Sequence, residues 1–166
     1  MTDTRTSTQP STDTTMDAIT RAVTAGRAGD VDEARRDLLD LWQAIGVAGD
    51  GLHRCALAHY LADLYGDPAQ ALAWDVRALD AADALTDSRV QQHQHNLRIA
   101  GFYPSLHLNL ADNYRRLGSF TAAAEHIDQA QRCSLNLGND PYGDMIRGAI
   151  SEVSAAIAAK DTRRRT

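Results

Sequence analysis

The sequence contains few aromatic residues, few cysteines and few prolines, and it has no long apolar run. Two cysteines and four prolines in 166 residues exclude a disulfide scaffold and a proline-rich filament. No apolar stretch approaches the ~20 residues that a membrane-spanning helix requires, so we expect no membrane span. Aromatic residues make up 5% of the chain, although 43% of it is hydrophobic. The apolar content is therefore mainly alanine and leucine, which favours helices over strands.

The net charge of −5 is unevenly distributed along the chain. Residues 160–166 form a basic C-terminal tail that carries +3, residues 1–15 carry −1, and the body between them carries −7. Nucleic-acid binding depends on clustered lysine and arginine, so an acidic body predicts no nucleic-acid partner. Residues 1–15 are mostly Thr, Ser, Asp and Gln, without the order of a secretory signal, and we interpret them as a disordered arm.

The two cysteines, Cys55 and Cys133, belong to no close-set cysteine pair. Free thiols persist in reducing compartments, so the simplest prediction is a cytoplasmic protein.

Glycine- and aspartate-containing breaks separate segments that have helical periodicity. Asp67-Pro68 and Asp140-Pro141 each combine an N-cap residue with proline in the first helical turn. No segment alternates as a strand does, so we predict an all-α chain. One apolar stripe with helical spacing is Leu72, Val76, Leu79 and Ala82. The expected helices span about 16–27, 30–46, 51–65, 68–85, 88–117 with a break at Pro104, 120–137 and 141–159.

The break at Pro104 follows two aromatic residues, Phe102 and Tyr103. Proline cannot continue the hydrogen-bond ladder of a helix. We interpret the three residues either as a kink packed into the array or as an exposed contact patch for another subunit.

One stretch has the spacing of a helix–turn–helix repeat. It reads His107-x2-Leu110-Ala111-x2-Tyr114, then Gly118, then Ala123-x3-Ile127-x2-Ala130. This pattern resembles the tetratricopeptide repeat (TPR), a 34-residue unit, with His107 at the usual tryptophan position and Ile127 at the usual phenylalanine position. Residues 58–74 resemble an earlier copy, because residues 61–65 read Leu-Ala-Asp-Leu-Tyr and residues 110–114 read Leu-Ala-Asp-Asn-Tyr. Residues 22–38 resemble a weaker third copy.

The resemblance implies an antiparallel helix-pair superhelix, a short solenoid over residues 16–159. It would contain about three degenerate repeats and a capping helix that starts at Pro141. In tetratricopeptide arrays the first helix of each pair lines a concave groove that binds a peptide or a partner protein. The resemblance therefore implies a protein- or peptide-binding adaptor or regulator, and it leaves a homodimer through the same face open.

The helix face opposite the His107 and Tyr114 stripe is predicted to line this groove. Asp63 and Asp112 occupy matching positions in the two clearest copies, so both acids are expected to face it. A polar groove of this kind suits an extended or charged peptide, whereas the competing interpretation is a solvated helix face. The predicted partner-binding residues are His59, Asp63, Asn109, Asp112, Arg115 and Arg116.

A second interpretation is a small metal-binding or catalytic helical protein. Cys55, His59 and Asp63 fall at i, i+4 and i+8 and so project from one helix face. Thiolate, imidazole and carboxylate are zinc-type ligands, and His107 is a further candidate on a later helix. The spacings match no dense metal motif, so we assign no metal and no other cofactor.

Catalysis has little support in the sequence. His59 with Asp63 one turn later has the composition of an oriented base, because a carboxylate fixes the tautomer of an imidazole. The chain has no phosphate-binding glycine loop and no nucleophile elbow. An enzyme is therefore the less favoured interpretation.

Overall fold

The computed structural model describes residues 13–87 and 100–165, and the chain is all-α throughout these ranges. The predicted fold class is confirmed. Within the described residues no helix is long and apolar enough to span a membrane. The helices are α1 (Thr14–Ala28), α2 (Val31–Ile45), α3 (Gly51–Asp63), α4 (Pro68–Asp87), α6 (Tyr103–Arg116), α7 (Phe120–Cys133) and α8 (Pro141–Ala158), with a 3₁₀ turn at Ser134–Asn136.

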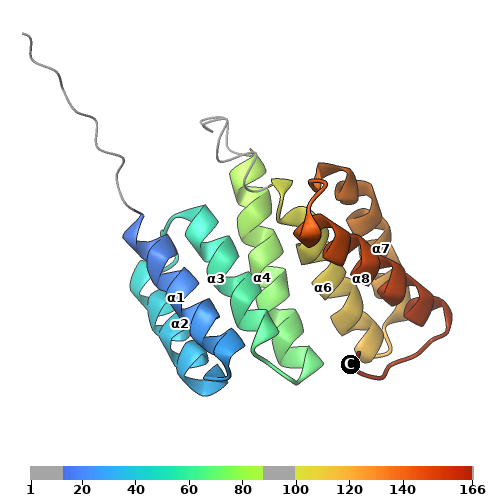
Figure 1. Cartoon of the computed structure of the whole chain (residues 1–166), viewed down its shortest axis with the longest axis horizontal. Coiled ribbons are helices and arrows are strands. Elements are labelled where there is room, and N and C mark those ends of the chain that lie inside the picture. Colours follow the sequence, from blue (N-terminus) through green and yellow to red (C-terminus); the bar gives the residue numbers. More distant parts are fainter. Residues whose placement is uncertain (1–12, 88–99, 166) are drawn as a thin grey trace, which may run out of the picture.

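The helices pack as successive hairpins. α1 packs on α2, α3 on α4, and α6 on α7, while α8 covers both α6 and α7. Neighbouring hairpins join through α2 and α3 and through α4 and α6, so the hairpins follow one another along the molecule in chain order (Figure 1). Helix pairs of this kind, stacked side by side, form the architecture that the sequence predicted.

Local side-chain chemistry sets the helix ends. The carboxylates of Asp13, Asp50 and Asp140 accept backbone N–H groups in the first turns of α1, α3 and α8. Gly29 ends α1 in the left-handed conformation, with φ of +117°, which favours glycine. Because Asp13 caps α1, residues 13–15 belong to this helix and its cap and not to the predicted disordered arm. Residues 1–12 of that predicted arm lie outside the described residues.

The core is built largely from alanine and leucine. Alanines of α3 and α4 meet Leu106 of α6 in one cluster, so the helices approach closely. Trp42 and Trp74 fill the remaining space with an edge-to-face contact whose ring centroids are 5.2 Å apart. The predicted stripe on α4 is correct in part: Ala82 is completely buried and Leu79 packs against this cluster, but Val76 is 47% exposed. The buried residues of α4 are Ala71, Asp75, Ala78, Ala81 and Ala82.

The segment around Pro104 packs into the array. α6 begins at Tyr103, with Pro104 buried in its first turn. Phe102 packs against two core clusters, and the hydroxyl of Tyr103 donates a hydrogen bond of 2.7 Å to Asp83. The break in the predicted helix 88–117 is thus the start of α6. Most of the predicted part before it, residues 88–99, lies outside the described residues.

Leu57 of α3 tests this packing, because its side chain is completely buried. Leu57→Ala is expected to lower the free energy of unfolding by about 2–5 kcal/mol through lost apolar contact and a residual cavity. Leu135→Ala is the matched control, since Leu135 is 90% exposed, and it should change stability by less than about 0.5 kcal/mol. Urea unfolding measures both values, and equal losses would contradict the assigned core.

Candidate functional site

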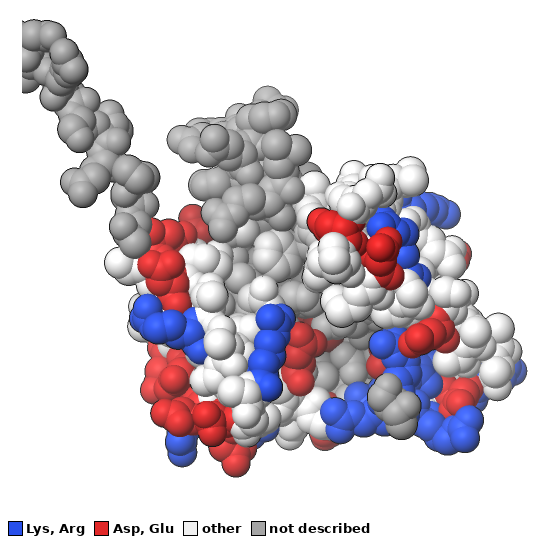
Figure 2. All heavy atoms as spheres, in the orientation of Figure 1, with Lys and Arg blue, Asp and Glu red and all other residues white. Residues whose placement is uncertain are grey.

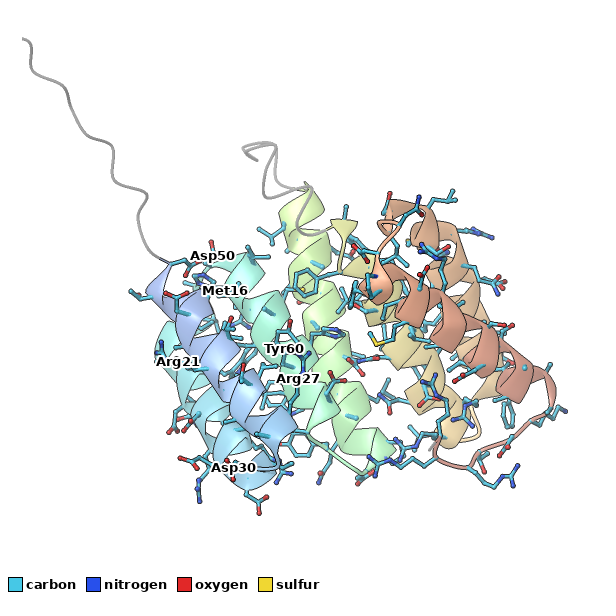
Figure 3. All side chains as sticks on the ribbon, in the orientation of Figure 1. Met16, Arg21, Arg27, Asp30, Asp50 and Tyr60 are labelled. Carbon is cyan, nitrogen blue, oxygen red and sulfur yellow. The ribbon has the colours of Figure 1, made fainter. Side chains whose placement is uncertain are left out.

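Three adjoining depressions form one inner groove between α1, α3, α6 and α8. Asp63 lines all three of them, and Tyr60 lines the two that border α1. Figure 3 shows Tyr60 and Arg27 close together in the middle of this face. The polar and aromatic side chains that these helices contribute to the inner groove include Arg27, Tyr60, Asp63, Asn109, Asp112 and Arg116.

A buried carboxylate lies at the floor of the inner groove. Asp75 of α4 is 0% exposed, and it accepts a hydrogen bond of 2.8 Å from Asn113 Nδ2. Asn109 Nδ2 bridges two acids, at 3.1 Å from Asp63 Oδ1 and 3.4 Å from Asp75 Oδ1. The Nδ1 atom of His59 is 3.8 Å from Asp75 Oδ1, beyond hydrogen-bonding distance. α3, α4 and α6 thus meet at this carboxylate.

The protonation of His59 and Asp75 is set by burial and by their proximity. Burial favours the neutral imidazole, but the carboxylates of Asp75 and Asp63 outweigh it and raise the pKa of His59. Burial raises the pKa of the Asp75 carboxyl, while His59 opposes that rise. Each of the two groups therefore favours the charged form of the other. The side-chain amides of Asn109 and Asn113 on α6 are the neutral hydrogen-bond donors to Asp75.

The predicted partner-binding residues differ in their accessibility. Asp63 and Asp112 line the same depression, and Asn109 joins Asp63 through a hydrogen bond. Arg116 also lines that depression and donates to the carbonyl of Gly66 at 2.7 Å. These four side chains therefore line one depression.

Two of the predicted residues are buried. Arg115 is 1% exposed, with its guanidinium donating to Asp112 Oδ1 at 2.7 Å and to the carbonyl oxygen of Asp161. Arg115 therefore holds the structure together and has no surface to offer a partner. His59 is 7% exposed and forms part of the wall between α3, α6 and α8.

Asp75 and Asn113 were not predicted as part of the site. Asp75 lies four residues after Ala71 and three before Ala78, on the buried alanine stripe of α4. An aspartate on that stripe is the sequence signal for a buried polar group, because such a position otherwise holds small apolar residues. Asn113 has no comparable signal, since its role depends on how α6 packs on α4.

The candidate metal ligands Cys55, His59, Asp63 and His107 are not brought together into one cluster. Among the described residues, no three histidine, cysteine or acidic side chains lie close enough together to hold a metal ion. Cys55 is completely buried in the core, and burial raises the pKa of its thiol to about 12, which suppresses the thiolate form. His107 contacts α7 instead of joining His59 and Asp63. Cys55 and His59 are packed against neighbouring helices, whereas Asp63 is exposed in the inner groove, so the three side chains of this helix face do not enclose an ion.

His107 pairs with His126 of α7. Their Nδ1 atoms are 3.0 Å apart, so one ring donates and the other accepts a hydrogen bond. Tyr103 stacks on His107, and Tyr114 stacks on His126. Burial lowers the pKa of both histidines, and each ring is therefore held in its neutral form.

Comparison with protein-family models, curated proteins and solved structures gives no match for this chain.

A double-mutant cycle tests the contact between Asp75 and Asn113. Asp75→Ala is expected to cost about 1–3 kcal/mol or more, because it leaves buried donors without an acceptor. Asn113→Ala should cost a similar amount, and the double variant less than the sum by about 0.5–3 kcal/mol. Urea unfolding of the four proteins measures the coupling, and additive costs would show that the two side chains act independently.

The histidine pair predicts a loss of stability in mild acid. The unfolded chain, with ordinary histidine pKa values near ~6.5, takes up protons before the folded chain as pH falls. The contribution of this pair to stability should therefore decrease as pH drops through ~6.5 and level off below the lowered pKa values of the folded state, whereas His59, whose pKa is raised, contributes equally to the wild type and to a variant at position 126. His126→Asn keeps a hydrogen-bonding atom near Nδ1 and removes one titrating group.

The test is urea unfolding of the wild type and the His126→Asn variant between about pH 5 and pH 8. Carboxyl groups contribute nearly alike to the two proteins, so the difference between them isolates the histidine. The wild type should lose more stability toward low pH, and parallel curves would contradict the assignment.

Proposed function

We propose that this chain is a short helical repeat protein of the tetratricopeptide type, which binds a peptide or protein segment as an adaptor or regulator. The observation that carries the proposal is the inner groove, whose three depressions share Asp63 and are lined mainly by the first helices of successive hairpins and by α8, with further residues of α2 and α4. The hairpins α3/α4 and α6/α7 coincide with the two stretches that resemble the repeat.

The chemistry of the inner groove suits an extended chain. A peptide presents a backbone donor and acceptor at nearly every residue. Asp63 supplies hydrogen-bond acceptors, Asn109 supplies a donor and an acceptor, and Arg116 supplies donors. Tyr60 adds a half-buried ring, which offers apolar contact area at low entropic cost. Side chains of this mixture, arranged along successive helices, support recognition of a segment several residues long.

The proposal is tested by selecting peptides from a displayed random library on the immobilised full chain. Binding of the selected peptides is then measured by titration with the wild type and with Asp63→Arg. The variant reverses a charge common to all three depressions, so we expect at least tenfold weaker binding, equivalent to ~1.4 kcal/mol.

Asp128→Arg is the matched control, because Asp128 is exposed on α7 and lines none of the three depressions of the inner groove. It makes the same charge change outside the proposed site and should leave binding within twofold. Equal binding by wild type and Asp63→Arg would remove the inner groove as the binding site.

A further inference from the structure

The basic C-terminal tail folds back across the inner groove. Lys160 adopts a left-handed backbone conformation, with φ of +50°, directly after α8. The next residue, Asp161, donates its N–H to the carbonyl of Ala156 at 2.9 Å, and its own carbonyl accepts from Arg115. The chain end consequently lies beside α6 and not beyond α8 (Figure 1). The tail is fixed at Asp161 by backbone contacts.

The last two described arginines, Arg164 and Arg165, reach the inner groove. Arg164 lines the depression next to α1 and the one between α3 and α6. Arg165 lines the second of these and the depression next to α8. Arg163 differs from both, because its guanidinium pairs with Asp161 at 2.6 Å. Two arginine side chains of the chain itself therefore share the inner groove with Asp63.

The charge of the inner groove is complementary to the charge of the tail. Asp63 contributes an exposed carboxylate to the depression between α3 and α6, whose other acids are the buried Asp75 and the Asp112 that pairs with Arg115. Arg116 is the single basic residue that the helices contribute to this depression. Figure 2 shows basic side chains gathered near the chain end on this face, with acidic side chains beside them. The body of the chain is acidic, so its field also favours a basic segment at this place.

The arginine contacts are weak compared with the anchor at Asp161. Arg165 donates to the carbonyl of Ala149 at 3.3 Å, and its Nε lies 3.8 Å from Glu152, a residue that is largely exposed. Exposed ion pairs of this type contribute about 0–1 kcal/mol. The two side chains can therefore leave the inner groove while the anchor holds.

We infer that the inner groove binds an arginine-bearing basic segment of a partner, and that Arg164 and Arg165 occupy that place within the same chain until the partner displaces them. This inference rests on the proposed function and names the class of its ligand. The tail is then a built-in competitor, tethered at Asp161.

The test compares the full chain with a chain ending at Thr162. That truncation retains Asp161 and its contacts with Arg115 and Ala156, so the fold keeps its anchor. The probe is a labelled synthetic peptide with the sequence of residues 160–166, Lys-Asp-Thr-Arg-Arg-Arg-Thr. The control peptide carries glutamate in place of the three arginines. Fluorescence anisotropy measures binding at low ionic strength, where exposed charges are least screened.

We expect the truncated chain to bind the basic peptide at least tenfold more tightly than the full chain, and to bind the glutamate peptide weakly or not at all. Asp63→Lys in the truncated chain should weaken binding of the basic peptide at least tenfold. In the full chain, Arg164→Gln with Arg165→Gln should reproduce the effect of truncation. This second variant keeps the chain length, so it separates loss of charge from any change in folding.

Equal binding of the basic peptide by the full and the truncated chain would contradict the inference that the tail competes for the inner groove. If the truncated chain bound the glutamate peptide more tightly than the basic peptide, the inference that the partner is basic would be wrong. Neither result affects peptides selected from the library, whose dependence on Asp63 tests the proposed function separately. Failure of the inference and failure of the proposed function therefore give different results.

Discussion

The structure depends on one buried carboxylate, that of Asp75. A buried acid is costly unless hydrogen bonds compensate for the water that it has lost, and here the amide of Asn113 and the more distant amide of Asn109 do so. Both amides come from α6, whereas Asp75 belongs to α4, so the contact links one hairpin to the next. A shift of α6 by a single turn would leave the acid with at most one of these donors, because Asn109 and Asn113 are themselves one turn apart. The same requirement positions Asn109 beside Asp63, and it therefore also shapes the inner groove.

A second buried charge fixes the opposite side of α6. The guanidinium of Arg115 donates hydrogen bonds to the carboxylate of Asp112, which neutralises its charge, and to the backbone carbonyl of Asp161. Asp112 is thereby engaged within the protein, even though it lines the inner groove. Asp63 is different, because it is exposed and its partner is a neutral amide. Of the two acids at matching positions, Asp63 has the negative charge that a ligand can still neutralise.

The helices were predictable because their ends are determined locally. Asp140 with Pro141 starts a helix by capping and by a preset backbone angle, whatever the helix later packs against. The buried face of α4 was predictable only in part, because this helix carries alanines on its exposed and on its buried sides, and Val76 of the predicted stripe is exposed while Ala82 is buried. The roles of Asn113, Arg115 and His126 depend on the register between neighbouring helices. The register between neighbouring helices cannot be derived from a single sequence, so the polar contacts between hairpins are visible only in the structure.

Tethering explains how weak contacts of the tail are sufficient for competition. Arg165 is four residues from the anchor at Asp161, so its effective concentration at the inner groove is of millimolar order, as for a short flexible linker. A tail whose free peptide binds with a dissociation constant of ~0.1 mM would then occupy its site about nine-tenths of the time. Tenfold inhibition follows from that occupancy. A dissociation constant of ~0.1 mM corresponds to about −5.5 kcal/mol, which the contacts of the whole tail would have to supply together, because an exposed ion pair contributes only about 0–1 kcal/mol. The fold thus needs no strong ion pair to Arg164 or Arg165, and it contains none among the described residues.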